Sequence, residues 1–553
     1  MRKKLALTAA ILALAVLAAG AADFSQYASP DLEPGECTAL IVGKLASADG
    51  SVMTSHTCDG NYDSRLTVVP GKTFKPGETV KILKDLLYSD NPSVKVTVLG
   101  EIPQVEKTYT YFQIAYPFMN ENQVMIGETT IGNKKELNNP SGMFYIEQLE
   151  AIALQRAKTA REAVKIMGEL AEKYGYADGG ECLTVTDANE GWVFECLGGG
   201  PLWAKDSGQP GAVWAAARVP DDKIFVSANR SRIGELDLSK PDWYMASPNV
   251  FSLAQDMGFW DGKSTFRFWE AYAPKDNPYN SRREWRVYST FAPSRNFDPF
   301  ARRYPFAVTP EKKVGVQDVM AIYRDHYEGT QFDLTKGVEA GPFGNPNRWA
   351  TKSAPNSGGW ERAISLFRCS YCFVSQARSW LPDAIGGVLW FGEDAPHATV
   401  YMPIYAGVTA VPKSLGIQNR YEYNRDSAWW AFDFVENWAN LSYSYMIKDI
   451  KAKQAQYEGE FFAMQGPVEA AAAAMYKTDP ALAKSFLTRY TNDAINRVVG
   501  EWWNFADELV AKYNDGYLWY KTKGYPDEWL AAVKYGDSAK FDKYKDLIYP
   551  DEK

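Results

Sequence analysis

The chain has 553 residues, which is enough for one large domain or for two to three smaller ones. Its 46% hydrophobic and 23% charged residues are typical of a globular protein, and its net charge of −8 argues against a nucleic-acid partner, which would require a basic face. The 18 Trp, 33 Tyr and 27 Phe suit either a large core or a surface that binds sugars or peptides.

Residues 1–22 have the pattern of a secretory signal peptide. A basic start, Met1–Lys4, precedes an apolar run over residues 5–19 and small residues at positions 20–22. The alternative is an uncleaved anchor, but the apolar run is short for a membrane span. No later segment of the sequence is long and apolar enough to cross a bilayer. We therefore expect an exported protein, periplasmic or extracellular, that is not bound to the membrane after signal cleavage.

The character of the chain changes at Cys37. Residues 23–36 are polar, with two Pro and one Gly, and are expected to form a leader without regular structure. From Cys37 an apolar strand over 37–46, an Asp-Gly turn and a second strand over 52–58 predict a β-hairpin. The cysteine is the first residue of this hairpin.

The rest of the chain predicts strands, then helices, then strands, and finally a helical tail. Thr159 and Glu162 have the spacing of a capping box, which marks the start of a helix. This order favours a layered α+β fold over a βαβ alternation. The expected segments are strands over 64–70, 94–115 and 123–131, two helices over 143–174, strands over 183–203 and 213–228, a mixture over 250–430, and helices over 427–513.

Two pairs of cysteines invite a disulfide or metal interpretation. Cys182 and Cys196 flank a predicted hairpin that turns near Asn189, and symmetric pairing about this turn would allow a cross-strand disulfide. Cys369 and Cys372 form a single CxxC motif. A zinc or redox role would need a second pair or more histidines than the three in the chain, so buried thiols or a local bridge are expected there. We expect no metal and no cofactor.

The position of Cys37 gives it a chemistry that the rest of the sequence lacks. No GxSxG motif is present, and three scattered histidines make a Ser-His-Asp site difficult to assemble. Removal of the leader would give Cys37 a free α-amine, whose reference pKa of about 7.7–8.0 suits it to take the thiol proton without a histidine. The structural alternative is an ordinary core cysteine.

Residues 37–60, CTALIVGKLASADGSVMTSHTCDG, resemble the start of the PepD-like dipeptidases. These are cysteine-type N-terminal-nucleophile (Ntn) hydrolases, related to penicillin V acylase and bile-salt hydrolase. No single motif is long, and the order of the motifs along the chain makes the resemblance specific. Further similar segments are NENQVMIGETT (120–130), GWVFE (191–195), ARVPDDKIFVSANRSRIGE (217–235), REWRVYSTFAPS (283–294), DHYEGTQFDLTKG (325–337), PDAIGGVLWFG (382–392) and WWNFADELVAKYNDGY (502–517).

The resemblance implies a fold, a maturation step and a reaction. The fold would be an α+β, four-layer αββα sandwich, with a catalytic domain over 37–426 and a helical extension packed on it over 427–553. The chain would remove residues 23–36 by autocatalysis and hydrolyse small peptide substrates, namely dipeptides, without a cofactor. The family also leaves open assembly into a homo-oligomer.

The resemblance also implies roles for single residues. Cys37 would be the nucleophile and, through its α-amine, the base. Asp59, at the end of the second strand of the hairpin, would hold that amine or the thiol, although an aspartate that caps a turn is the alternative. Asn120 and Asn229 occupy the places of the oxyanion donors, and donors of this kind are worth about 2.7–4 kcal/mol.

The roles that the resemblance implies for Arg283 and His56 each have an alternative. Arg283 would support the nucleophile, with Arg282 and Arg286 as competitors and a surface ion pair as the structural alternative. His56 would contact the substrate, or it would be a partly buried histidine with satisfied hydrogen bonds.

Two other functions compete with a dipeptidase. An N-acyl amidase of the penicillin V acylase type would use the same nucleophile but would need an apolar acyl pocket, whereas a dipeptidase needs an acidic group for the free substrate amine. A non-catalytic exported binding protein, with aromatic side chains stacked on sugars, would show no processing at Cys37.

Overall fold

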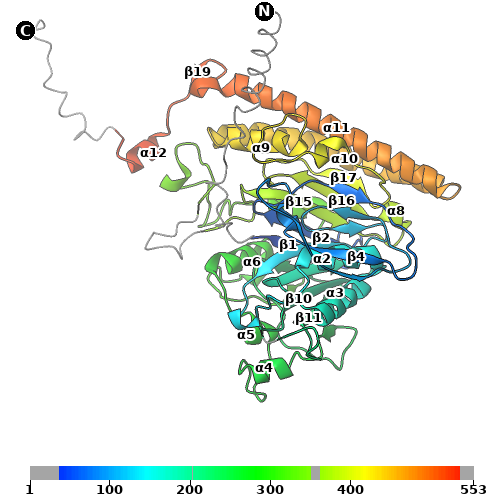
Figure 1. The fold of residues 1–553 in the computed structure, drawn as a ribbon. Helices are drawn as coiled ribbons and strands as arrows, with labels where there is room; N and C mark the ends of the chain where they lie inside the picture. Colours follow the sequence, from blue (N-terminus) through cyan, green and yellow to red (C-terminus); the bar gives the residue numbers. More distant parts are fainter. Residues whose placement is uncertain (1–35, 202, 350–360, 536–553) are drawn as a thin grey trace, which may run out of the picture.

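The computed structural model describes residues 36–201, 203–349 and 361–535. The predicted signal peptide, residues 23–35 of the leader and the last 18 residues of the expected extension lie outside the described residues. The described chain has mixed α and β content, with two large antiparallel sheets and a helical C-terminal region (Figure 1). Within these ranges, no helix has both the length and the apolar character that crossing a membrane requires.

The first sheet has the predicted hairpin at its centre. Its two strands pair in antiparallel register from Thr38 opposite Thr57 to Val42 opposite Met53, and every residue of both strands is buried. The hairpin prediction is thus confirmed. In spatial order the sheet contains β14 (Ala307–Val308), β12 (Ile224–Ser227), β1 (Thr38–Val42), β2 (Met53–Asp59), β15 (Cys369–Gln376), β16 (Val388–Glu393) and β17 (Met402–Tyr405).

The second sheet contains strands from the segments predicted over 64–70, 94–115, 123–131, 183–203 and 213–228, together with β7 (Met119–Asn120) and β13 (Tyr244–Ala246), which were not predicted. Residues 97–103 of these segments lie in a separate ribbon, and residues 224–227 lie in the first sheet. In spatial order the second sheet contains β13, β11 (Ala212–Val219), β10 (Gly191–Gly198), β9 (Gly180–Thr186), β8 (Met125–Ile131), β7, β6 (Tyr111–Gln113) and β3 (Thr67–Val69). Two short ribbons are separate from both large sheets: β4 (Thr79–Lys84) with β5 (Thr97–Pro103), and β18 (Tyr517–Leu518) with β19 (Lys521–Thr522).

The two large sheets face each other through small side chains. Thr54 of β2 and Thr184 of β9 share a hydrogen bond between their hydroxyl oxygens at 2.6 Å. A Cβ atom at Gly127 of β8 would lie 2.9 Å from the carbonyl oxygen of Ser55, so only glycine permits this close approach. The centre of β1 and β2 therefore packs directly on β8 and β9.

Helices cover the outer side of each sheet. The two helices predicted over 143–174 are α2 (Ile146–Arg156) and α3 (Ala160–Tyr174), which pack on strands of the second sheet. Thr159 Oγ1 accepts a hydrogen bond from the Glu162 backbone N–H at 3.1 Å, which confirms the predicted cap. The remaining shorter helices are α4 (Ser252–Asp256), α5 (Phe268–Tyr272), α6 (Pro278–Phe291), α7 (Val316–Tyr323), α8 (Asp383–Gly386) and α12 (Asp527–Ala532).

The helical C-terminal region lies against the first sheet, on the opposite side of the molecule from α3 (Figure 1). It contains α9 (Ala428–Ala439), α10 (Tyr443–Tyr476) and α11 (Pro480–Tyr513), which matches the helical tail expected over 427–513. The ring of Trp390 on β16 stacks on Phe462 of α10, with ring centroids 4.3 Å apart.

The disulfide interpretation of Cys182 and Cys196 was wrong, because the hairpin register differs by one residue from the symmetric one. Cys182 lies opposite Glu195, and Cys196 lies opposite Glu181. The Asp187 carboxylate accepts hydrogen bonds from the backbone N–H groups of residues 189 and 190 and so fixes the turn at 187–190. A shift of one residue moves a side chain to the other face of a strand. All six cysteines of the chain are free and buried, including the CxxC pair.

Candidate active site

Cys37 lies at the edge of the central hairpin, one residue before β1. The strand register continues beyond β1, because the Glu36 backbone N–H donates to the Asp59 carbonyl oxygen at 3.0 Å. The Cys37 side chain is completely buried. Burial, contact with Cys58 and the charge of Glu128 raise the pKa of the Cys37 thiol well above its ordinary value. In this form the thiol is therefore protonated, and it requires a base before it can attack a carbonyl group.

Arg283 on α6 binds the backbone of the nucleophile. Its Nη1 donates to the Cys37 carbonyl oxygen at 2.8 Å and to Thr38 Oγ1 at 3.0 Å, and its Nη2 donates to Asn229 Oδ1 at 2.8 Å. Burial, followed by the charge of Arg362, lowers the pKa of Arg283 to about 10. Its two competitors face elsewhere, because Arg282 pairs with Glu361 and Arg286 pairs with Asp325.

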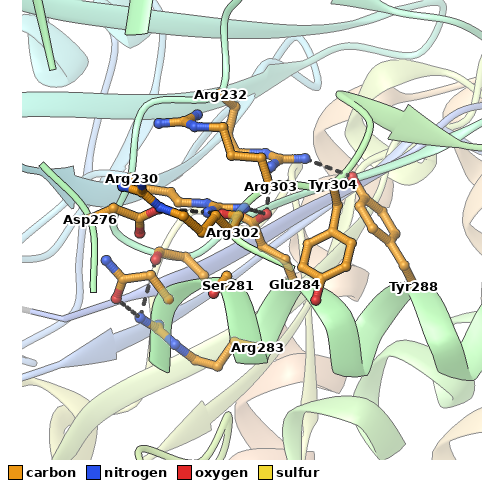
Figure 2. A network of polar contacts seen from close by, with 12 residues as sticks. Arg230, Arg232, Asp276, Ser281, Arg283, Glu284, Tyr288, Arg302, Arg303 and Tyr304 are labelled. Atoms are coloured by element: carbon orange, nitrogen blue, oxygen red, sulfur yellow. Dashed lines mark hydrogen bonds and ion pairs between the residues drawn. The ribbon is translucent and has the colours of Figure 1, made fainter. Parts of the chain in front are cut away.

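Helix α6 also fixes the loop that carries Asn229. The next residue on the helix, Glu284, is fully buried and binds Arg230 and Arg232, which follow Asn229 in the chain. Figure 2 shows Arg230 and Arg232 near Glu284, and Arg283 next to Glu284 on α6. One helix therefore holds the carbonyl group of Cys37 and the loop after β12 in a fixed relation.

The two predicted oxyanion donors have different surroundings. Asn229 has a left-handed backbone (φ 61°), and its Nδ2 donates to the Thr130 carbonyl oxygen at 2.9 Å. Asn120 Nδ2 donates to the carbonyl oxygens of Leu154 and Ala157 at 2.8 and 2.9 Å, which ties the end of α2 to the turn before β8. Both Asn120 N–H groups are used in these bonds, and its assignment as an oxyanion donor remains a prediction.

Arg362 belongs to this site, although no sequence motif singled it out. Its guanidinium donates to the carbonyl oxygen of Glu36 and to the Asp59 carboxylate, and its Nε lies 2.9 Å from Glu36 Oε2. Burial acts to lower the pKa of Arg362, but the charges of Asp59 and Glu36 outweigh it and raise the pKa. Asp59 also accepts a hydrogen bond from Thr57 Oγ1 at 2.9 Å. Asp59 and Arg362 thus meet at the peptide bond that precedes Cys37.

His56 lies on β2, between the sheets, with only 1% of its surface exposed. Its Nε2 is 3.5 Å from Glu128 Oε2, and neither ring nitrogen has a hydrogen-bond partner among the described residues. The Cys37 sulfur, a nitrogen of His56 and an oxygen of Glu128 all lie within 4.8 Å of one another. Glu128 was not predicted, although a glutamate within the apolar strand MIGETTI is a visible signal. The three groups could hold a metal ion, but the chemistry below does not depend on one.

The chain is similar to known peptidases over most of its length. The model of peptidase family C69 matches residues 36–456. The "Probable dipeptidase" of Latilactobacillus sakei is 26% identical over 417 residues, which cover 70% of this chain and 80% of that protein. The "Probable dipeptidase" of Salmonella dublin is 27% identical over 383 residues, with 67% and 81% covered. "Dipeptidase A" of Lactobacillus helveticus is 24% identical over 407 residues, with 70% and 79% covered. The chain therefore belongs to peptidase family C69 and is a cysteine-type peptidase.

Proposed function

We propose that this protein is an exported dipeptidase whose N-terminal nucleophile, Cys37, becomes active when the preceding residues are removed. The observation that carries the proposal is the pair of arginines at this cysteine. Arg362 binds the carbonyl oxygen before it, and Arg283 binds the carbonyl oxygen after it. The names of the similar proteins supply the substrate class.

The first reaction would be removal of the leader. The Cys37 sulfur attacks the carbonyl carbon of Glu36 through a five-membered ring, and the thiol proton passes to the Cys37 nitrogen as the C–N bond breaks. Water then hydrolyses the thioester and releases the carboxyl group of Glu36. Arg362 already donates a hydrogen bond to the Glu36 oxygen, where negative charge develops, so it is placed to stabilise this step.

The second reaction would be turnover of the dipeptide. The new α-amine takes the proton from the buried thiol, which by itself would stay protonated. The thiolate attacks the peptide carbonyl carbon, and the protonated amine gives its proton to the leaving amino acid. Water hydrolyses the thioester and regenerates the thiol. Asn229 has one Nδ2 hydrogen beyond its bond to Thr130 and can stabilise the oxyanion. Asn120 would serve as the second donor only by giving up one of its Nδ2 bonds to the carbonyl oxygens of Leu154 and Ala157.

The arrangement of layers supports an assignment to the αββα sandwich of the Ntn hydrolases. Two antiparallel sheets face each other, α2 and α3 pack on one, and α9, α10 and α11 pack on the other. The nucleophile lies at the start of a central strand, as that assignment requires. Export is proposed from the pattern of residues 1–22 alone.

The test is to determine the N-terminus of the purified protein by intact mass and Edman sequencing. We expect the wild type to begin at Cys37 and the Cys37→Ala variant to retain the leader that follows the signal peptide. The wild type should hydrolyse dipeptides, and the variant should be inactive. If both proteins begin near Asp23, Cys37 has no α-amine, and the proposal fails.

A further inference from the structure

Glu128 is a buried glutamate next to the nucleophile, and among residues 36–201, 203–349 and 361–535 its only ion-pair partner is a histidine. It is 0% exposed, and its Oε1 accepts only a long hydrogen bond from Thr130 Oγ1 at 3.3 Å. Its Oε2 has no hydrogen-bond partner, and its one ion-pair partner among the described residues is His56 at 3.5 Å. A buried charge is costly unless it is paired and hydrogen-bonded, so an unpaired oxygen here indicates a missing partner.

We propose that Glu128 binds the free α-ammonium group of the dipeptide substrate. This inference rests on the proposed function and assigns the group that distinguishes a dipeptidase from an acyl amidase. A carboxylate can form a charge-assisted hydrogen bond to an ammonium group, but it would face an uncharged or apolar group if the substrate amine were acylated.

The distance from Glu128 to the nucleophile fits this role. In a dipeptide the α-nitrogen is two bonds, or about 2.5 Å, from the carbonyl carbon that is attacked. The sulfur approaches that carbon to about 3–3.5 Å, and an ammonium–carboxylate hydrogen bond is about 2.8 Å long. A carboxylate oxygen that binds the ammonium group must therefore lie no more than about 8–9 Å from the sulfur. The carboxylate oxygen of Glu128 lies within 4.8 Å of the Cys37 sulfur.

Aromatic rings complete the surroundings of the proposed ammonium site. The rings of Tyr116, Tyr371 and Phe373 make T-shaped contacts with His56, with centroids 5.7–5.9 Å from the imidazole. Aromatic rings attract ammonium groups through their negative faces. The pKa of Tyr116 is raised, first by burial and then by Tyr62. The charges of Glu128 and Cys37 contribute to the same rise, which indicates that both groups lie close to this ring.

A second carboxyl group, that of Glu181, contacts Glu128. Glu181 lies on β9 opposite Thr130 of β8, and so diagonally from Glu128. Burial, followed by the charge of Glu128 and contact with it, raises the pKa of Glu181 well above its ordinary value. Glu181 is then a neutral neighbour, and it supplies no positive charge to pair with the Oε2 atom of Glu128.

The experiment compares two substrates that differ only in the amine: alanyl-alanine and propionyl-alanine, which has hydrogen in place of the ammonium group. We expect the processed wild type to hydrolyse alanyl-alanine with a kcat/KM at least about 100-fold higher. In Glu128→Gln this preference should fall to about tenfold or less, because activity on alanyl-alanine is lost to a larger extent than activity on propionyl-alanine. Processing to Cys37 should be complete in both proteins. The control is Glu393→Gln, which changes another buried glutamate on β16 and should keep the wild-type preference.

Two results would overturn the inference. An equal loss of activity on both substrates in Glu128→Gln would mean that Glu128 serves the nucleophile and not the amine. A wild type that is processed and hydrolyses both substrates equally would refute the amine site without any variant, even if Glu128→Gln does not fold, and would leave the Cys37 mechanism intact. A processed wild type that hydrolyses neither these substrates nor other dipeptides would refute the proposed function itself.

Discussion

At the residue scale, the site consists of charged and polar side chains that are linked by hydrogen bonds around the buried Cys37. Arg362 connects Asp59 to the peptide bond before Cys37, and Arg283 connects the carbonyl oxygen of Cys37 to Asn229. Both arginines are completely buried. Because a guanidinium group presents several N–H donors in a fixed plane, each arginine can hold two or more partners at once.

Replacement of Arg362 by Gln should slow removal of the leader. The variant keeps a hydrogen-bond donor but loses the charge that faces the Glu36 oxygen, so processing should slow by about 100-fold or more, the usual effect of losing an oxyanion donor. Intact mass spectrometry at timed intervals after refolding measures the rate. Arg282→Gln, which loses the ion pair to Glu361 and the contacts with Pro299, Phe300 and Phe332 but none with Cys37, should process normally. Processing of Arg362→Gln at the wild-type rate would exclude this role.

Local sequence identified the residues that lie in or next to the first hairpin. Cys37 and Asp59 are part of one contiguous motif, and the motif around Arg283 singled out its helix. Arg362 and Glu128 come close to Cys37 only because segments that are distant in the sequence fold together. Contacts of this kind cannot be predicted from the spacing of residues in the sequence. The competition among the three arginines of α6 could be decided only by the direction that each side chain takes from the helix.

At the element scale, α2 begins on a half-buried carboxylate. Asp178, just before β9, accepts a hydrogen bond from the Ile146 backbone N–H at the first turn of the helix, at 3.3 Å. Burial nevertheless raises the pKa of Asp178 to about 6, more than the backbone hydrogen bonds lower it. The fold thus favours the protonated form, and the charged form costs stability.

Asp178→Asn should stabilise the protein at pH 7.5 but not at pH 4. The pKa of Asp178 is higher in the folded protein than in the unfolded chain. The loss of stability caused by its ionisation is therefore fully present above about pH 6 and disappears below about pH 4. A shift of about two units corresponds to about 3 kcal/mol, and we expect a gain of about 1–3 kcal/mol at pH 7.5. Urea unfolding at both pH values measures it, with the exposed Asp242→Asn as control. An equal gain at both pH values would show that the charge of Asp178 is not its cause.

The elements themselves were more predictable than their pairing. Alternating and apolar runs placed the central hairpin, and the cap at Thr159 placed α3. The hairpin of β9 and β10 was also predicted, but its register depended on the hydrogen bonds of the Asp187 side chain, which a symmetric reading of the sequence does not include. The order of strands in each sheet depends on contacts between distant segments, such as that of β2 with β15.

At the scale of the whole molecule, the helical C-terminal region completes the core of the first sheet. Thr491 of α11 donates a hydrogen bond to the Pro403 carbonyl oxygen on β17 at 3.1 Å, and Trp502 of the same helix is fully buried. Without this region, the outer faces of β16 and β17 would be exposed to water.

A chain that ends at Asn440, and so lacks α10 and α11, should not give a soluble folded protein. The expected cause is exposure of apolar surface such as that of Trp390, which α10 covers. Size-exclusion chromatography and circular dichroism provide the measurement. A chain that ends at Lys523 removes α12, none of whose residues is buried, and should fold normally. A monomeric, cooperatively unfolding chain ending at Asn440 would show that the first sheet is stable without these helices.

The unpaired cysteines have a consequence for how the protein can be made. Because no covalent cross-link holds the six thiols together, the fold does not depend on an oxidant, a disulfide isomerase or an oxidising compartment. Dithiothreitol has no bond to break in this chain, and the temperature of unfolding should be the same with and without it. The polypeptide can therefore reach its folded state in a reducing cytosol as readily as outside the cell.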